Sequence, residues 1–491
     1  MFLSSETLRP FIKDCGKMPE HKSDHNPIFI VLDFAKFCKG KGTWKFQDTL
    51  LKQQDYVELI NKTITETCSK YVEFGDGSNF YEEASQSEME EFCNLDIDEI
   101  SSLNYKINPN LLYEMIMNDI RNATISFSTN LSHSHKKHEE YLFKEINRLT
   151  VLNSNGALDQ EIMIKEIEYN ESISSRSEKF IINSKITNKV EGEKATKFFC
   201  NLQKNFSAQR YIHKLVKNNN GTDITITDQN SIEKELFHFY KDLYQNQDDN
   251  LIFNTAEEFL EGENVNVPKL CEATANSIEG DLKLNELTDA LKKSRNESSP
   301  GPNGFTYSFF KVFWTKLKNF LLNSANYSLK NGALPDSLTQ GVLSLLPKGD
   351  KPKQFLKNWR PITLLNVDYK LISSAIAARI NSSLPEIIHQ DQCGFIRGRF
   401  IGESIRTTYD TLDYVKNKKI TALLLILDFK KAFDSVSFQA ILKSMSFFGY
   451  KESMIKWVKT LLNNFRARIN HAGNLSDFFN INRGARQGDP V

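Results

Sequence analysis

The sequence of 491 residues predicts an α+β fold, in which short apolar strands lie between amphipathic helices. Three features indicate this class. Apolar residues recur every three or four positions over 111–149, as they do on one face of a helix. Short apolar runs at 27–33, 341–346 and 421–427 have the length and composition of strands. Residues 291–491 alternate such runs with helical segments, which predicts a mixed sheet and helix domain.

The first half of the chain is predicted to contain one strand, an acidic linker and several helices. Residues 27–33 are strongly apolar, and a strand of this kind is expected to be covered on both faces. Residues 71–100 contain ten acidic residues and no lysine or arginine, which predicts a solvated linker. A further helix is expected after Thr227 or Asp228, either of which can cap its first turn.

The second half begins with a helix and a rigid turn. Residues 284–291 have the leucine spacing of a helix, and the proline- and glycine-rich residues 298–304 must end it. We place a domain boundary near 285–300, because the net charge changes sign there. The elements expected after the turn are a helix over 309–317, strands over 341–346 and 361–365, helices over 369–384 and 400–417, and the apolar strand over 421–427.

Charge is distributed unevenly along the chain. Residues 291–491 hold 30 basic and 14 acidic residues, a net charge of +16, and residues 1–290 carry the opposite net charge. This asymmetry predicts that the basic part binds nucleic acid or another polyanion. No apolar run approaches the ~20 residues that a membrane span needs, so no membrane association is expected. The seven cysteines lack metal spacing and a C-x-x-C pair, which favours a reducing, intracellular compartment.

The segment 423–436 carries the clearest chemical signal. Asp428 follows an apolar run directly, and a carboxylate in such surroundings is costly unless a cation neutralises it. Divalent metals that prefer hard oxygen ligands suit this position. A strand-end cap is the alternative, and this segment alone leaves both open. Asp434, six residues later, is interpreted as the N-cap of the next helix.

Six short motifs occur in a familiar order. They are Pro300-Gly-Pro-Asn-Gly304, Leu346-Pro-Lys348, Asn358-Trp-Arg-Pro-Ile362, Gln392-Cys-Gly-Phe395, Asp428 to Asp434, and Arg486-Gln-Gly-Asp-Pro490. This series resembles the fingers and the first half of the palm of the right-hand polymerase fold, as found in reverse transcriptases of non-LTR (LINE-type) retrotransposons. Each motif alone is weak, but six in the same order are a strong signal.

The resemblance implies roles for residues near Asp428. Asp428 would be the first metal-binding carboxylate, assisted by the carbonyl of Phe429, in a site for two Mg²⁺ ions. Phe433 would crowd a ribose 2′-hydroxyl and so select deoxynucleotides. The alternative for Phe433 is a core aromatic that packs the corner between strand and helix.

The resemblance also implies a nucleotide-binding set. Lys348 and Arg360 would hold the incoming triphosphate, Arg360 with two bonds and Lys348 as a point charge. Gln487 and Gly488 would lie against the templating base and the nucleotide, where a glycine lets the backbone come close. For Arg360 the alternative is a surface ion pair.

The beginning of the chain resembles a second enzyme of the same polyproteins. Ser23-Asp24-His25-Asn26-Pro27, followed by an apolar strand, is similar to the end of an apurinic-type endonuclease, an α/β sandwich in which a histidine oriented by an aspartate acts at the phosphate. Gly42 to Phe46 and Gly192 to Phe199 resemble linker signatures of these polyproteins. We therefore expect an endonuclease remnant over 1–35, an acidic linker and helical connector over 36–290, and fingers with half a palm over 291–491.

Departures from the family limit the expected activity. The aromatic-x-Asp-Asp motif and the thumb do not occur in these 491 residues, so the chain is expected to be truncated at both ends and inactive alone. Asn303 stands where the family often has aspartate. The expected partners are an RNA template, a DNA primer or target and deoxynucleoside triphosphates, in the cytoplasm and nucleus. The alternatives are a catalytically dead nucleic-acid-binding relic, a group II intron-like reverse transcriptase, and an RNA-dependent RNA polymerase, which Phe433 disfavours.

Overall fold

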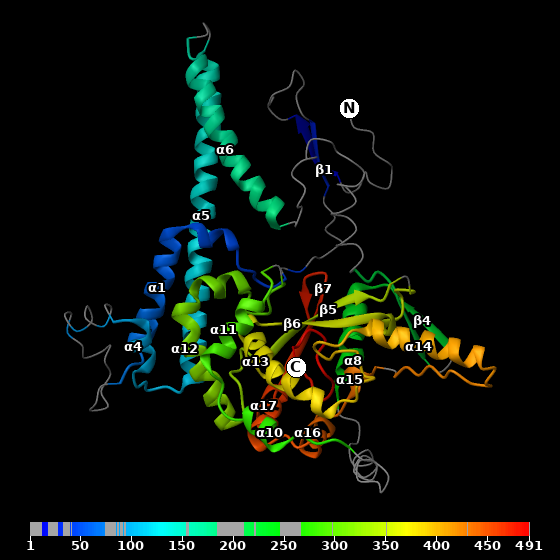
Figure 1. The fold of residues 1–491 in the computed structure, drawn as a ribbon. Coiled ribbons are helices and arrows are strands. Elements are labelled where there is room, and N and C mark those ends of the chain that lie inside the picture. The colour runs from blue at the N-terminus through cyan, green and yellow to red at the C-terminus, as the bar shows by residue number, and fades with distance from the viewer. Residues whose placement is uncertain are drawn as a thin grey trace.

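The computed structural model describes residues 12–17, 28–32, 40, 42–73, 85, 88, 92, 95–153, 157–183, 211–219, 222–245, 267–296, 298–349, 351–429 and 431–490. Helices and a central mixed sheet make up this part of the chain, which confirms the α+β prediction (Figure 1). None of the described helices is both long and apolar enough to cross a lipid bilayer.

Near the N-terminus, β1 (Ile12–Lys17) pairs antiparallel with β2 (Ile28–Leu32). The strand predicted over 27–33 is therefore present. The expectation that both of its faces are covered is wrong at Val31, which is 42% exposed. Among the described residues β2 pairs only with β1, and no second layer of this part of the chain covers the side chain.

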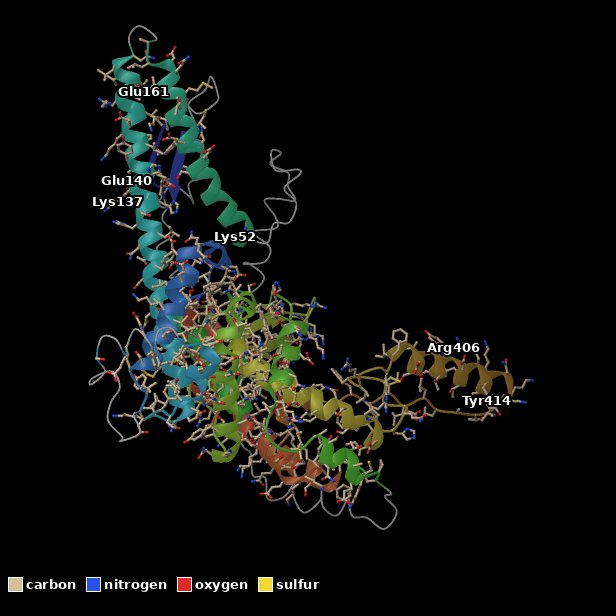
Figure 2. All side chains as sticks on the ribbon, turned by 60° about the vertical axis from the view of Figure 1, so that its left-hand side comes forward. Lys52, Lys137, Glu140, Glu161, Arg406 and Tyr414 are labelled. Carbon is tan, nitrogen blue, oxygen red and sulfur yellow. The ribbon has the colours of Figure 1, made fainter. Side chains whose placement is uncertain are left out.

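A helical scaffold follows, built on α1 (Gln54–Ser69), α4 (Ile97–Ser102), α5 (Pro109–Leu152) and α6 (Asp159–Asn183). The prediction of a helix over 111–149 is confirmed: Asn108 caps α5 by accepting a bond from Leu111 N, and Pro109 occupies the first turn. The first half of α5 packs on α1 and α12, and its second half pairs with α6. This second half forms the long hairpin that projects from the body, with Glu161 near its tip (Figure 2).

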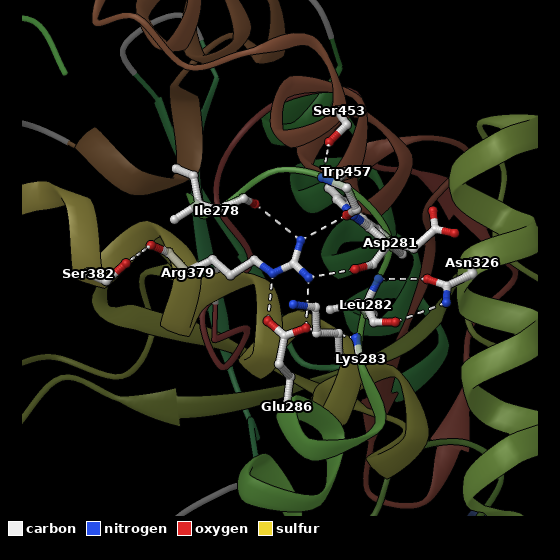
Figure 3. Close-up of polar contacts among 11 residues, drawn as sticks. Ile278, Asp281, Leu282, Lys283, Glu286, Asn326, Arg379, Ser382, Ser453 and Trp457 are labelled. Carbon is white, nitrogen blue, oxygen red and sulfur yellow. Dashed lines mark hydrogen bonds and ion pairs between the residues drawn. The ribbon is translucent and has the colours of Figure 1, made fainter. Parts of the chain in front are cut away.

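The centre of the helical part is α12 (Tyr307–Asn331), against which α11 (Leu284–Lys293) and α13 (Val367–Ile387) are arranged. Thr306 caps α12, and Gly332 ends it in the left-handed conformation with φ +72°. Arg379 of α13 donates to both carboxylate oxygens of Glu286 in α11, at 2.6 and 2.7 Å (Figure 3). This pair joins α11, at the expected domain boundary near 285–300, to α13, which lies well beyond it.

The central sheet has the strand order β6-β5-β7-β8, and β9 also pairs with β7. β5 runs antiparallel to β6 and parallel to β7, so Leu346 lies opposite Arg360, and Val342 lies between Leu364 and Arg468. One face of the sheet is packed into the core through residues such as Leu343. The strands are β5 (Gln340–Pro347), β6 (Trp359–Leu365), β7 (Arg466–His471), β8 (Asn474–Leu475) and β9 (Phe479–Asn480).

A hairpin and a helix lie beside this sheet. The hairpin consists of β3 (Leu215–Asn219) and β4 (Thr222–Ile226), and α8 (Gln229–Tyr244) follows, capped by Asp228 as predicted. The remaining elements are η2 (Asp48–Lys52), α10 (Glu272–Ser277), η4 (Leu356–Asn358), α14 (Ile401–Asn417), α15 (Ala432–Ser435), α16 (Phe438–Phe447) and α17 (Glu452–Leu462).

The apolar segment 421–427 departs most from expectation. The prediction of a buried strand is wrong: the segment has no regular structure, and its side chains are exposed, Leu423 by 90% and Leu427 by 75%. A strand needs a neighbour for its backbone groups, and no strand of the described chain pairs with this segment. The preceding helix α14 buries none of its residues, and its Arg406 and Tyr414 lie far from the body (Figure 2).

Candidate functional site

Two of the predicted site residues meet at one end of the β5–β6 hairpin. The backbone N–H of Lys348, just after β5, donates to Asn358 O at 2.8 Å, and Arg360 lies opposite Leu346. Because alternate residues of a strand share a face, Lys348 and Arg360 lie on the same face of the sheet. Lys348 Nζ donates to Lys357 O at 3.0 Å, whereas the exposed Arg360 forms no ion pair with a described carboxylate. The surface ion pair considered for Arg360 is thus absent from the described residues.

The loop that carries Gln487 is held between β6 and α15. Thr363 N in β6 donates to Gln487 O at 2.7 Å, and the Gln487 side-chain amide donates to Asp434 Oδ1 at 3.0 Å. Ala485 N donates to Phe433 O at 2.6 Å. These bonds bring Gln487 and Phe433, which are far apart in sequence, to the same edge of the sheet.

Gly488 lies where a side chain has no room. Its φ is +109°, and an added Cβ would lie 2.8 Å from Thr363 O. The missing Cβ therefore lets this loop approach the backbone of β6, in a conformation that other residues rarely adopt. Whether the same glycine also lies against a nucleotide stays a prediction.

Asp434 has a different role from the one predicted. It lies inside α15 and accepts from the Gln487 amide, whereas Ser437 is the N-cap of α16, so the N-cap interpretation of Asp434 is wrong. The carboxylate is 9% exposed. Burial raises its pKa, while the Gln487 amide and the charges of Lys431 and Lys348 partly oppose this rise.

Phe433 is exposed by 57%, so the alternative of a core aromatic is wrong. Its ring meets that of Phe395, from the Gln392–Phe395 motif, edge to face at 5.7 Å between centroids. An exposed aromatic side chain beside the Gln487 loop is compatible with contact to a ligand.

A buried polar network behind the loop was not predicted. Arg486 Nε donates to Asp489 Oδ2 at 2.9 Å, and the guanidinium lies 4.0 Å from the centroid of the Phe465 ring. Tyr369 Oη donates to the same carboxylate oxygen at 2.8 Å. Arg486 and Asp489 both belong to the motif at 486–490, but the motif did not indicate that they bond to each other and to Tyr369. The network fixes the Gln487 loop to α13.

Another buried carboxylate, that of Asp368, ties the turn at 300–304 to the scaffold. Asp368, 1% exposed, accepts from Tyr369 N at 3.0 Å, from Tyr113 Oη at 3.2 Å, and from Asn303 Nδ2 at 3.4 and 3.5 Å. Burial raises the pKa of Asp368 to about 6, although these hydrogen bonds lower it in part. Asn303, the departure from the family pattern, thus supplies a neutral donor to this carboxylate.

Asp428 and Phe429 do not occupy the buried position predicted for them. Both belong to the exposed segment that ends at residue 429, so the prediction that a buried strand presents Asp428 is wrong. No group of three or more His, Cys, Asp or Glu side chains in the described chain is arranged to hold a metal ion. One exposed carboxylate and one carbonyl do not fit a site for two Mg²⁺ ions. The metal-binding roles of Asp428 and Phe429 stay predictions.

Asp24 and His25 lie outside the described residues, as does the segment 192–199. The linker signature at 42–46, by contrast, lies within the described residues and packs against the turn at 300–304. Phe46 N donates to Gly304 O at 3.0 Å, and the Trp44 ring meets Phe305 edge to face at 5.5 Å. Gly304 has φ +84°, and an added Cβ would lie 2.3 Å from the Trp44 ring.

Comparison with known proteins shows what the chain is similar to. Residues 346–491 match the family described as reverse transcriptase (RNA-dependent DNA polymerase). The Transposon TX1 uncharacterized 149 kDa protein of Xenopus laevis is 26% identical over 482 residues, which are 96% of this chain and 33% of that protein.

Two further relatives are similar to shorter parts of the chain. The Retrovirus-related Pol polyprotein from type-1 retrotransposable element R2 of Popillia japonica is 27% identical over 40% of this chain and 27% of its own length. The Probable RNA-directed DNA polymerase from transposon BS of Drosophila melanogaster is 27% identical over 32% of this chain and 17% of its own length. The chain thus spans a third or less of these relatives, which confirm the resemblance to non-LTR retrotransposon proteins.

Proposed function

Because residues 346–491 match the reverse transcriptase family and the relatives are retrotransposon proteins, we propose that this chain is part of an RNA-directed DNA polymerase. It would provide the fingers and part of the palm over 291–491. Its partners would be an RNA template, a DNA primer or target and deoxynucleoside triphosphates, in the cytoplasm and nucleus. The segments 1–35 and 36–290 would be an endonuclease remnant and a connector.

One observation carries this proposal. Lys348 and Arg360 share a face of the β5–β6 hairpin, and the Gln487 loop is bonded to the edge of the same hairpin through Thr363. Two cations next to each other suit a triphosphate, which Arg360 can grip with two bonds and Lys348 as a point charge. Gln487 and Gly488 would contact the templating base and nucleotide, and Phe433 would exclude a ribose 2′-hydroxyl.

Reverse transcriptases use divalent metal ions, which stabilise the charge on the phosphates during transfer. The described residues offer a single exposed carboxylate at Asp428 and do not form such a site. We infer that the chain alone binds substrates without extending a primer. This also keeps the alternative of a nucleic-acid-binding relic, in which Asp428 has no function.

Nucleotide binding tests the proposed site. Arg360→Ala is expected to weaken binding of a deoxynucleoside triphosphate by about tenfold in a fluorescence titration with template and primer present, because one charge-assisted contact is lost. Arg295→Ala, at another exposed position, is the matched control and should leave the affinity unchanged. Equal affinities for the two variants would refute the assignment of Arg360.

Primer extension tests the expected lack of activity. With Mg²⁺, an RNA template and a labelled DNA primer, the full 491-residue chain should add no nucleotides. Incorporation that Asp428→Ala abolishes would overturn this inference and would show that Asp428 joins a working metal site.

A further inference from the structure

Two arginines from distant parts of the chain lie close together beside the sheet. Arg121 belongs to α5 and Arg468 to β7. Partial burial lowers the pKa of Arg468, and the positive charge of Arg121 lowers it further. The fold therefore holds two like charges near each other in partly desolvated positions.

Aromatic rings cover one side of both guanidinium groups. Arg121 Cζ lies 5.4 Å from the centroid of the Trp44 ring, and Arg468 Cζ lies 4.9 Å from that of Phe478. The Nε atoms of both arginines are buried and have no hydrogen-bond partner. Cation–π contacts compensate part of the lost hydration, but they do not satisfy these N–H donors.

Two carboxylates on or next to α5 and β7 bond to other groups. Asp336 pairs with Arg466 at 3.3 Å, and Glu114, two turns before Arg121 on α5, accepts from Ser337 N at 2.8 Å. Within the described residues, no ion pair reaches Arg121 or Arg468. The repulsion between these two charges is therefore not relieved by the protein itself, and an anion bound between them would relieve it.

The position of Arg468 indicates which anion. On β5, Val342 lies opposite Arg468 of β7, and Leu346 lies opposite Arg360 of β6. Val342 and Leu346 are four residues apart on one strand and share a face, so the two arginines lie on that same face of the sheet. The separation is about 13 Å along the strands and about 10 Å across them. A nucleic-acid strand advances about 3.4 Å per nucleotide, so about five nucleotides would span the two positions.

We propose that Arg121 and Arg468, with Trp44 and Phe478, bind the phosphodiester backbone of the single-stranded RNA template about five nucleotides from the incoming nucleotide. The guanidinium groups would take the phosphates, and the exposed parts of the rings would stack on unpaired bases. The identity of this ligand rests on the proposed function. The site itself rests on the paired arginines.

Binding of a labelled 15-nucleotide single-stranded RNA to the full chain tests this proposal, with Arg121→Gln and Arg468→Gln as variants. Each variant should raise Kd by about tenfold and make the slope of log K against log salt less negative by about 0.7. Arg148→Gln, on the same helix and already paired with Glu145, is the matched control and should change neither quantity. Unchanged Kd and slope in both variants would overturn the proposal.

Thermal unfolding separates binding from a structural role. Each variant removes one of two repelling charges and also one cation–π contact, so Tm should change little. A large fall in Tm with unchanged Kd would show that the arginines serve the fold alone. A DNA strand of equal sequence is the second arm, and a loss confined to DNA would overturn the assignment to the template. Wild-type protein that binds no RNA would refute the proposed function, whereas binding that is insensitive to both variants refutes only this site.

Discussion

Arg379→Met is expected to destabilise the protein strongly, because it removes the donor at the centre of a buried polar cluster. Besides its two bonds to Glu286, Arg379 donates to the backbone oxygens of Ile278, Gly280 and Asp281 at 2.8 to 3.1 Å (Figure 3). Methionine fills a similar length but donates nothing. The variant therefore leaves a carboxylate and two carbonyls without this donor, whereas Gly280 O keeps its bond from the Trp457 indole.

The magnitude follows from the burial of the two partners. The Arg379 side chain is 8% exposed and that of Glu286 is 24% exposed. Breaking a fully buried pair costs about 3–5 kcal/mol. Because water reaches part of Glu286, we expect the lower end, about 3 kcal/mol, in the free energy of unfolding. Urea denaturation at pH 7, monitored by circular dichroism, measures this value.

Two further variants check the physical reason. The double variant Arg379→Met with Glu286→Leu removes both charges and should recover most of the lost stability, because no charge then stays unpaired. Glu286→Gln, which keeps hydrogen-bonding capacity, should cost less than Arg379→Met. A loss below about 1 kcal/mol for Arg379→Met would refute the argument that this pair joins α11 to α13.

Three shorter predictions follow. The folded-state pKa of Asp368, about 6, lies above the ordinary 3.8, so its contribution to stability is complete well below pH 3.8 and is lost as the pH rises through 6. The stability difference between wild type and Asp368→Asn should therefore fall by about 2.4 kcal/mol from pH 4 to pH 7 in urea titrations. Gly488→Ala should cost about 1–3 kcal/mol and weaken nucleotide binding, because its Cβ would meet Thr363 O, whereas Gly398→Ala, with φ +83° and open space, should cost less and spare binding. Leu425→Asp, at a 70% exposed position, should change the free energy of unfolding by less than about 0.5 kcal/mol, whereas Leu343→Asp in β5 should prevent folding. A large loss of stability for Leu425→Asp would show that the segment 421–427 is buried.

The helices could be predicted because their signals are local. Periodic apolar residues and a cap define α5 and α8, and the caps Asn108 and Asp228 accept from backbone N–H groups three residues later. Proline and glycine at 298–304 likewise determine a turn through the backbone conformations that they favour locally. These features need no knowledge of distant parts of the chain.

The structure of the apolar segment 421–427 could not be predicted from local signals in this way. Its composition is that of a buried strand, but burial depends on a partner strand and on a covering layer. Neither is present beside it among the described residues, and the leucines stay exposed. β5, with a similar composition, is buried because β6 and β7 flank it.

In the candidate site too, local motifs predicted the residues but not their long-range contacts. Motifs located Lys348, Arg360, Gln487 and Gly488, because each motif is a short contiguous segment. They could not reveal that the Gln487 amide bonds Asp434, 53 residues away, or that Tyr113 reaches Asp368 over 255 residues. Such contacts depend on the tertiary fold, in which side-chain direction and burial decide the partner.

Net charge is similarly incomplete as a guide to nucleic-acid binding. The basic segment 291–491 predicts the half that meets a polyanion, yet the paired arginines come from both halves, Arg121 from the acidic one and Arg468 from the basic one. Like Arg360, neither guanidinium of this pair has a carboxylate partner among the described residues, whereas Arg148 and Arg379 each do. What distinguishes the pair is that two such charges lie near each other with their Nε atoms buried. Uncompensated charge at a defined position, rather than the total over a segment, therefore indicates where a phosphate backbone would bind.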